Sequence, residues 1–162
     1  MSATNQNKNN MGLLHNKTVH LALRAVQGVF AIIVLGLAGY VAHWWNGYWN
    51  ASSPSEINFL IFCAVWTLLV LIYFVLAGTT SGARVHHPYA VLGLDAITMI
   101  FWFAGFIAVA VFVHNRGCFG GVCRAAKAAA VFGAFEWLLF AITTAISALA
   151  LRGHKAGPVA TV

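Results

Sequence analysis

Four long apolar runs, separated by short polar segments, constrain the fold of this chain more than any other feature. They cover approximately residues 21–45, 57–77, 89–114 and 125–151. A helix needs about 20 apolar residues to cross the hydrocarbon core of a bilayer, so each run is long enough to span a membrane. The sequence therefore predicts an all-α integral membrane protein, an antiparallel four-helix bundle with short loops.

The composition of the chain supports this class and excludes a soluble domain. Hydrophobic residues make up 61% of the 162 residues, and charged residues make up only 7%, where a soluble protein carries roughly a quarter. The net charge of +6 arises mostly at the ends of the apolar runs, where Lys and Arg meet anionic headgroups. No basic stretch is interleaved with aromatic residues, so we expect no nucleic-acid partner.

The distribution of basic residues predicts the orientation of the bundle. Residues 1–18 are polar and predict a flexible N-terminal tail, 19–152 form the bundle, and 153–162 form a C-terminal tail. The tails, the start of the first run and the middle loop carry two thirds of the Lys and Arg, namely Lys8, Lys17, Arg24, Arg84, Arg152 and Lys155. The positive-inside rule therefore places both termini in the cytoplasm.

The same orientation places two modification candidates outside the cytosol. Asn50 begins the sequon Asn50-Ala51-Ser52, and Cys118 and Cys123 lie in or beside one Gly-rich loop. Glycosylation and disulfide formation both belong to that compartment. We expect possible N-glycosylation at Asn50 and a short structural disulfide between Cys118 and Cys123. A redox pair or half of a metal site is the alternative for the two cysteines, although no further ligand cluster completes such a site.

Two acidic residues inside the apolar runs require partners. Glu136 lies near the middle of the fourth run and Asp95 about two turns into the third, where a lipid-facing charge costs at least about 3 kcal/mol. Helix rise places Asp95 roughly 9 Å and Glu136 roughly 13 Å from the cytoplasmic surface, close to Arg24. We predict an intramembrane polar cluster in which Arg24, with Gln27 one turn on, bridges Asp95 and Glu136. Alternatively, Arg24 extends to the headgroups and one acid is neutral and bonded to its own helix.

Small side chains predict where the helices approach one another closely. The positions that we expect to pack between helices are Gly28, Ala31, Gly39, Gly105, Ala129 and Gly133. A repeat of small residues at Ala126, Ala130 and Ala134 is also compatible with self-association, although packing inside one bundle uses the same pattern.

The order of these motifs resembles a known family. RAVQG enters the first run, LDAITMIFWFAGF lies in the third, a C-x4-C loop follows, and AAKAAAVFGAFEWLLF begins the fourth. From about Val19 to Arg152 the chain is similar to the fungal MARVEL-domain proteins. The resemblance implies a four-helix membrane bundle with cytoplasmic termini. It also implies roles in membrane apposition, vesicle trafficking or the organisation of plasma-membrane domains. The long loops and tails of the occludin-like and synaptophysin-like branches are missing.

Two classes of function follow from these features. The first is a non-enzymatic membrane protein of the plasma membrane or secretory vesicles, whose partners are membrane lipids, with sterol and sphingolipid as candidates, and other copies in a homo-oligomer or lateral assembly. The second is a small ion- or proton-coupled transporter or channel that uses Glu136 and Asp95. No nucleophile, metal-ligand set or phosphate-binding loop accompanies these acids, so we expect no enzyme activity, no cofactor and no metal.

Overall fold

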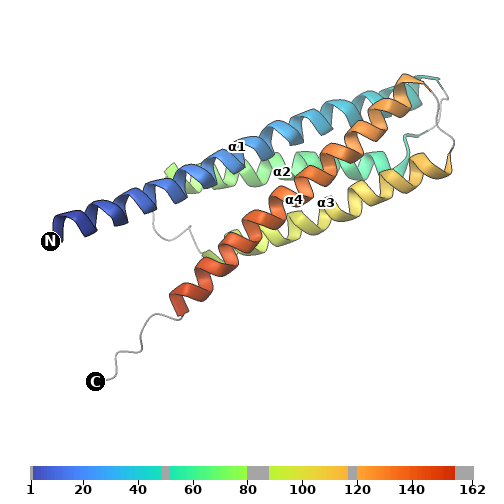
Figure 1. Ribbon diagram of the computed structural model, residues 1–162. Helices are drawn as coiled ribbons and strands as arrows, with labels where there is room; N and C mark the ends of the chain where they lie inside the picture. The colour runs from blue at the N-terminus through green and yellow to red at the C-terminus, as the bar shows by residue number, and fades with distance from the viewer. Residues whose placement is uncertain (1, 49–51, 80–87, 117–119, 156–162) are drawn as a thin grey trace.

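Four helices follow one another along the chain and lie side by side in alternating directions (Figure 1). The computed structural model describes the backbone of residues 2–48, 52–79, 88–116 and 120–155, and side chains within 18–48, 52–77, 89–116 and 120–152. The helices are α1 (Ser2–Tyr48), α2 (Ser55–Thr79), α3 (Pro88–Asn115) and α4 (Gly121–Lys155). In Figure 1, α1 begins and α4 ends at the same end of the bundle, the terminal end. The opposite end, where α2 and α4 begin, is the loop end.

Each helix contains a segment long and apolar enough to cross a membrane. These segments are Thr18–Tyr48, Ser55–Ala77, Tyr89–Asn115 and Gly121–Arg152. They contain or closely match the four runs expected from the sequence, so the predicted all-α four-span bundle is confirmed. The loop-end boundaries extend a few residues beyond the apolar runs because polar residues complete the first and last helical turns.

The N-terminal segment differs from the expectation. The sequence predicts a flexible tail over residues 1–18, whereas α1 is helical from Ser2. Extending an existing helix adds one hydrogen bond for each residue that is ordered, and this segment contains no proline to interrupt it. The polar composition therefore excludes this segment from the apolar span but does not stop the helix.

Proline and glycine fix the points where the helices begin. The carbonyl of Pro54 accepts hydrogen bonds of 3.1 Å from the amides of Ile57 and Asn58, which starts α2. Pro88 occupies the first position of α3, where its missing amide hydrogen costs nothing. Gly120 has a φ of 86°, a left-handed conformation that favours glycine, and it directly precedes α4. These residues therefore mark the points where α2, α3 and α4 begin.

The helices form a closed ring. Each packs against its neighbours in sequence, α1 also packs against α4, and the most extensive contact is between α3 and α4. On α1 the side chains with at most 1% exposure follow alternating steps of four and three residues: Gln27, Ala31, Val34, Ala38 and Val41. This spacing is that of a left-handed coiled seam, in which one stripe of each helix stays against its partners.

Glycines lie where neighbouring side chains leave no room for another carbon. A Cβ added to Gly105 of α3 would lie 3.1 Å from Leu60 Cδ1 of α2. One added to Gly133 of α4 would lie 3.2 Å from Phe106 Cβ of α3. The same addition at Gly28 would lie 3.4 Å from a methyl group of α2. These positions therefore allow the close approaches that the sequence predicts.

The other small residues give a mixed outcome. Ala31 and Ala129 are fully buried, as expected for packing positions. Gly39 was expected among them, and this prediction is wrong, because a Cβ added there would meet nothing within 4 Å. The buried seam of α1 passes through Ala38 and Val41, so Gly39 is rotated away from the partner helices.

The outward faces of all four spans are apolar. Large side chains are exposed on each helix, including Val29 and Ile32 of α1, Leu69 and Ile72 of α2, Ile100 and Phe103 of α3, and Phe135 and Leu138 of α4. Buried polar side chains, in contrast, point into the bundle: Gln27, Thr67, Asp95, Thr98, Glu136 and Thr143. This inside-out distribution suits a bundle whose solvent is lipid.

Candidate functional site

An ion pair joins α1 to α3 in the half of the bundle nearer the terminal end. Arg24 donates from Nη1 and Nη2 to the two carboxylate oxygens of Asp95, each at 2.7 Å. The Asp95 side chain has no exposed surface, and that of Arg24 is 14% exposed. Two parallel charge-assisted bonds of this length form the strongest geometry available to an Arg–carboxylate pair. The predicted contact between these two residues is therefore present.

The same arginine connects the other helices. Arg24 Nη1 also donates to Gln27 Oε1 at 3.2 Å, and Gln27 Nε2 donates to Thr143 Oγ1 of α4 at 3.5 Å. The Arg24 guanidinium lies 4.3 Å from the centre of the Phe74 ring on α2, within cation–π range. We call Arg24, Gln27, Phe74, Asp95 and Thr143 the Arg24 cluster. It connects all four helices within one layer of the bundle.

Glu136 is not part of this cluster, so the prediction that Arg24 bridges both acids is wrong. Its side chain is fully buried, and neither carboxylate oxygen has a hydrogen-bond partner in the described part of the chain. Thr143 occupies the place expected for Glu136, and it lies seven residues, or roughly 10 Å, nearer the terminal end of α4.

The position of Glu136 explains why no partner reaches it. It lies near the middle of the α4 span, Gly121–Arg152, and not in the half that contains Arg24. Its carboxyl group approaches the backbone of Ala31 on α1. The amide of Ala31 lies in the interior of a helix and already donates within it, so this contact leaves the carboxyl without a full hydrogen bond.

A second set of hydrogen bonds joins α2 to α3. Trp66 Nε1 of α2 donates to Thr98 Oγ1 of α3 at 3.1 Å, and Trp102 Nε1 of α3 donates to Thr67 Oγ1 of α2 at 2.9 Å. Both threonines in turn donate to carbonyls of their own helices, Thr98 to Leu94 and Thr67 to Cys63. This reciprocal pairing satisfies two indoles that would otherwise lose their hydrogen bonds in the membrane.

The sequence contains signals for several of these residues. Thr98 and Trp102 lie one turn apart and share a helical face with Asp95. Thr143 lies two turns after Glu136, on the same side of α4. A polar residue on the same helical face as a buried acid therefore indicates that this face points into the bundle.

The predicted modification sites fall largely outside the described residues. Asn50 and Cys118 both lie outside the described residues, so the glycosylation of Asn50 and the disulfide between Cys118 and Cys123 stay predictions. Cys123 is described, as a buried free thiol in the first turn of α4.

The Arg24 cluster and the Trp–Thr pairs have mainly a structural role. Asp95 uses both oxygens on one arginine, and the described members of the Arg24 cluster include no hydroxyl or thiol paired with a base as nucleophilic catalysis requires. Glu136 differs, because a buried carboxyl without a partner is a place where a proton or a cation can bind.

Comparison with known proteins places this site within a described domain. The family model of MARVEL, described as a membrane-associating domain, matches residues 16–146. The match includes the Arg24 cluster, both pairs of Trp–Thr hydrogen bonds and Glu136. No curated protein and no solved structure matches the chain.

Proposed function

The chain belongs to the MARVEL family, and on that premise we propose that it is a non-enzymatic four-span protein that organises membrane domains. Membrane apposition and vesicle trafficking are the processes that such a protein would serve. It would act by packing with lipids and with other copies of itself. The plasma membrane or secretory vesicles, with both termini in the cytoplasm, are its proposed location.

The observation that carries this proposal is the division between the polar interior and the apolar exterior of the bundle. The Arg24 cluster and the Trp–Thr pairs use their hydrogen bonds inside the protein. The exposed side chains of all four spans are large and apolar. The surface that the spans present is therefore suited to acyl chains and to other apolar helices, whose contacts depend on shape and packing.

Contacts between copies would use larger side chains than the sequence suggests. Ala126 and Ala130 are buried within the bundle, so they are occupied by internal packing. Val131, Phe135 and Leu138 of α4 are exposed and lie on a neighbouring face. We propose this α4 face as the contact between copies.

The test is the distribution of the protein in a bilayer. Copies labelled with donor or acceptor dyes would be reconstituted at low density into vesicles of phosphatidylcholine, sphingomyelin and sterol. We expect energy transfer above the value for random mixing, and a lower value for the double variant Phe135→Ala and Leu138→Ala. The matched control is Leu69→Ala with Ile72→Ala on α2, which should change nothing. Random mixing of the unaltered protein would refute the proposal.

The second candidate function is ion- or proton-coupled transport, and the unpartnered carboxyl of Glu136 is the observation that favours it. Asp95 supports it less, because the ion pair with Arg24 occupies both of its oxygens. Proton or cation flux into proteoliposomes separates the two functions. A leak that Glu136→Gln abolishes and Glu56→Gln preserves would establish transport, whereas the scaffold proposal predicts no flux above that of empty vesicles.

The orientation and the modifications have separate tests. A shift in mass on treatment with peptide-N-glycosidase, lost in Asn50→Gln, would support cytoplasmic termini. A second sequon, Asn16-Lys17-Thr18, precedes the first span, and loss of the shift in Asn16→Gln instead would invert the topology. Thiol labelling of Cys118 and Cys123 before and after reduction tests the proposed disulfide.

A further inference from the structure

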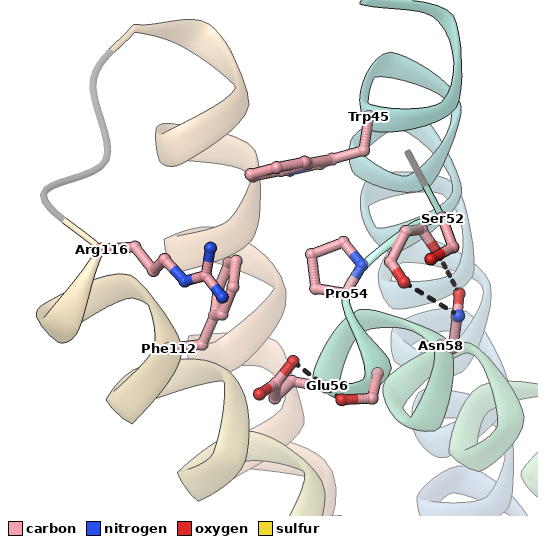
Figure 2. Close-up of a pocket in the computed structure, with 9 residues that line it drawn as sticks. Trp45, Ser52, Pro54, Glu56, Asn58, Phe112 and Arg116 are labelled. Atoms are coloured by element: carbon pink, nitrogen blue, oxygen red, sulfur yellow. Dashed lines mark hydrogen bonds between the residues drawn. The ribbon is translucent and has the colours of Figure 1, made fainter. Parts of the chain in front are cut away.

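A pocket of about 530 Å³ opens at the loop end of the bundle (Figure 2). Its walls come from the end of α1, the entry to α2 and the end of α3, through Trp45, Ser52–Glu56, Asn58, Phe112 and Arg116. A second hollow of about 350 Å³ shares Glu56, Phe112 and Arg116 and continues along α3 past Ala108 and Val111. The two hollows together lead from the loop end toward the lipid-facing side of α3.

Opposite charges border this pocket without pairing with each other. Glu56 and Arg116 both point toward it in Figure 2, and among the described residues the ion pair found is Arg24 with Asp95. The Glu56 carboxylate accepts a hydrogen bond of 3.2 Å from Ser55 Oγ. Each charge also suits the dipole of its own helix end, but that role does not require the two to share a pocket.

Two aromatic rings form a corner of the same pocket. The ring centres of Trp45 and Phe112 are 6.3 Å apart, with an angle of 63° between their planes. The Arg116 guanidinium lies 5.6 Å from the Phe112 ring, and in Figure 2 Trp45 lies above it and the Glu56 carboxylate below it. A carboxylate and a guanidinium at separate points of one pocket are a favourable environment for a ligand that carries both an ammonium group and a phosphate.

The depth of the pocket in the membrane indicates which kind of ligand can reach it. Trp45 belongs to the aromatic residues at the end of the α1 span, where Trp44 and Tyr48 also stack at 5.1 Å. Aromatic residues of this kind mark the depth of the phospholipid headgroups. A ligand at this depth that carries a phosphate and an ammonium is the headgroup of a zwitterionic phospholipid.

We propose that this pocket binds the headgroup of a zwitterionic phospholipid, with its ammonium group on Glu56 and its phosphate on Arg116. The second hollow would carry the glycerol and the first part of an acyl chain past Ala108 and Val111. An anionic lipid fits less well, because Glu56 repels a second negative charge. The proposal names a lipid partner for the membrane-organising function and rests on that function.

The test measures lipid retention on dispersed copies. The protein, purified in a non-ionic detergent, would be mixed with equal amounts of dioleoyl phosphatidylcholine and dioleoyl phosphatidylglycerol, and bound lipid counted by native mass spectrometry. We expect phosphatidylcholine to be retained at least roughly threefold over phosphatidylglycerol. Glu56→Gln and Arg116→Gln should each weaken its binding by roughly threefold or more, the usual effect of losing one charged contact.

Matched variants separate the pocket from general effects of charge. Arg124→Gln removes an exposed cation at the start of α4 that does not line the pocket. It should retain phosphatidylcholine, as should Arg116→Lys, which keeps the charge if the glutamine variant fails to fold. Equal retention of both lipids by the unaltered protein, or equal losses in Arg116→Gln and Arg124→Gln, would overturn the proposal.

Two further arms identify the source of the ligand and its link to function. Soluble phosphocholine that displaces the lipid at equal concentration would overturn the assignment to a membrane lipid. If the protein shows no lipid preference but still clusters in vesicles, only the pocket proposal is overturned. If it prefers phosphatidylcholine but mixes randomly in vesicles, only the proposed membrane-organising function is overturned.

Discussion

Asp95 and Glu136 are both fully buried acids in neighbouring helices, yet their surroundings differ completely. Asp95 receives two 2.7 Å bonds from Arg24, whereas Glu136 has no hydrogen-bond partner among the described residues. The first lies in the half of the bundle near the terminal end, where a long basic side chain can enter from the surface. The second lies near the middle of the α4 span, where no basic side chain among the described residues bonds to it.

This difference indicates that the two acids contribute oppositely to the bundle. A buried ion pair with good geometry is costly to break from one side, because the remaining charge has no partner. A buried polar group without a partner costs stability as long as it is present. The Arg24 cluster should therefore hold the helices together, and Glu136 should weaken them unless it serves another purpose.

The largest expected effect comes from breaking the Arg24 cluster. Arg24→Met leaves Asp95 buried without a cation and should lower the free energy of unfolding by about 3 to 5 kcal/mol. The double variant Arg24→Met with Asp95→Leu should recover most of this loss. Thermal unfolding in detergent, followed by circular dichroism, measures both. A double variant no more stable than Arg24→Met would show that the pair is not the source of the stability.

The packing around Glu136 gives the next effect. Gly133 lies one turn before it, against Phe106 and the ring of Trp102, so Gly133→Val should overpack α3 against α4 and cost about 2 kcal/mol. Gly39→Val is the control, because a side chain at that position meets open space within the described residues. Equal melting temperatures for the two variants would contradict the close approach of α3 and α4.

Removal of the unpartnered acid should have the opposite sign. Glu136→Leu replaces a buried carboxyl with an apolar side chain of similar length and should raise the free energy of unfolding by about 1 kcal/mol. The measurement is the same thermal unfolding series. A clear loss of stability would mean that Glu136 has a partner in the folded protein.

The smallest effect should come from one Trp–Thr pair. Thr67→Val keeps the shape of the side chain but removes the acceptor of the Trp102 indole, and a single bond of this kind in a membrane protein contributes about 0.6 kcal/mol. Thr144→Val is the control, since the Thr144 hydroxyl has no hydrogen-bond partner among the described residues. A loss of stability as large as that of Arg24→Met would mean that the hydrogen bonds between α2 and α3 stabilise the bundle as much as the Arg24 cluster does.

Sequence alone could predict the fold and half of the buried cluster, for a physical reason. The spans can be predicted from the length and polarity of the apolar runs. The depth of a residue in the membrane can be predicted from the helix rise, and it places Arg24 and Asp95 at the same level. The rotation of each helix depends on neighbours that the local pattern does not show. The seam on α1 therefore passes through Ala38 and leaves out Gly39, and Thr143 takes the place expected for Glu136.

The loop-end pocket could not be predicted in this way, because its residues are distant in sequence. Trp45, Glu56 and Arg116 come from three helix ends, and each has an ordinary local explanation as a membrane-surface aromatic or a helix-end charge. Only the return of α3 to the end where α1 stops and α2 begins brings the three residues around one space (Figure 2).

The most direct test is a paired comparison of two nearly isosteric substitutions, Asp95→Asn and Glu136→Gln, in the same detergent and at the same pH. Each replaces one carboxyl oxygen with an amide nitrogen and changes little else. We expect the midpoint of thermal unfolding to fall clearly for Asp95→Asn and to stay the same or rise for Glu136→Gln. The reverse order would show that Glu136, and not the Arg24 cluster, holds the bundle together.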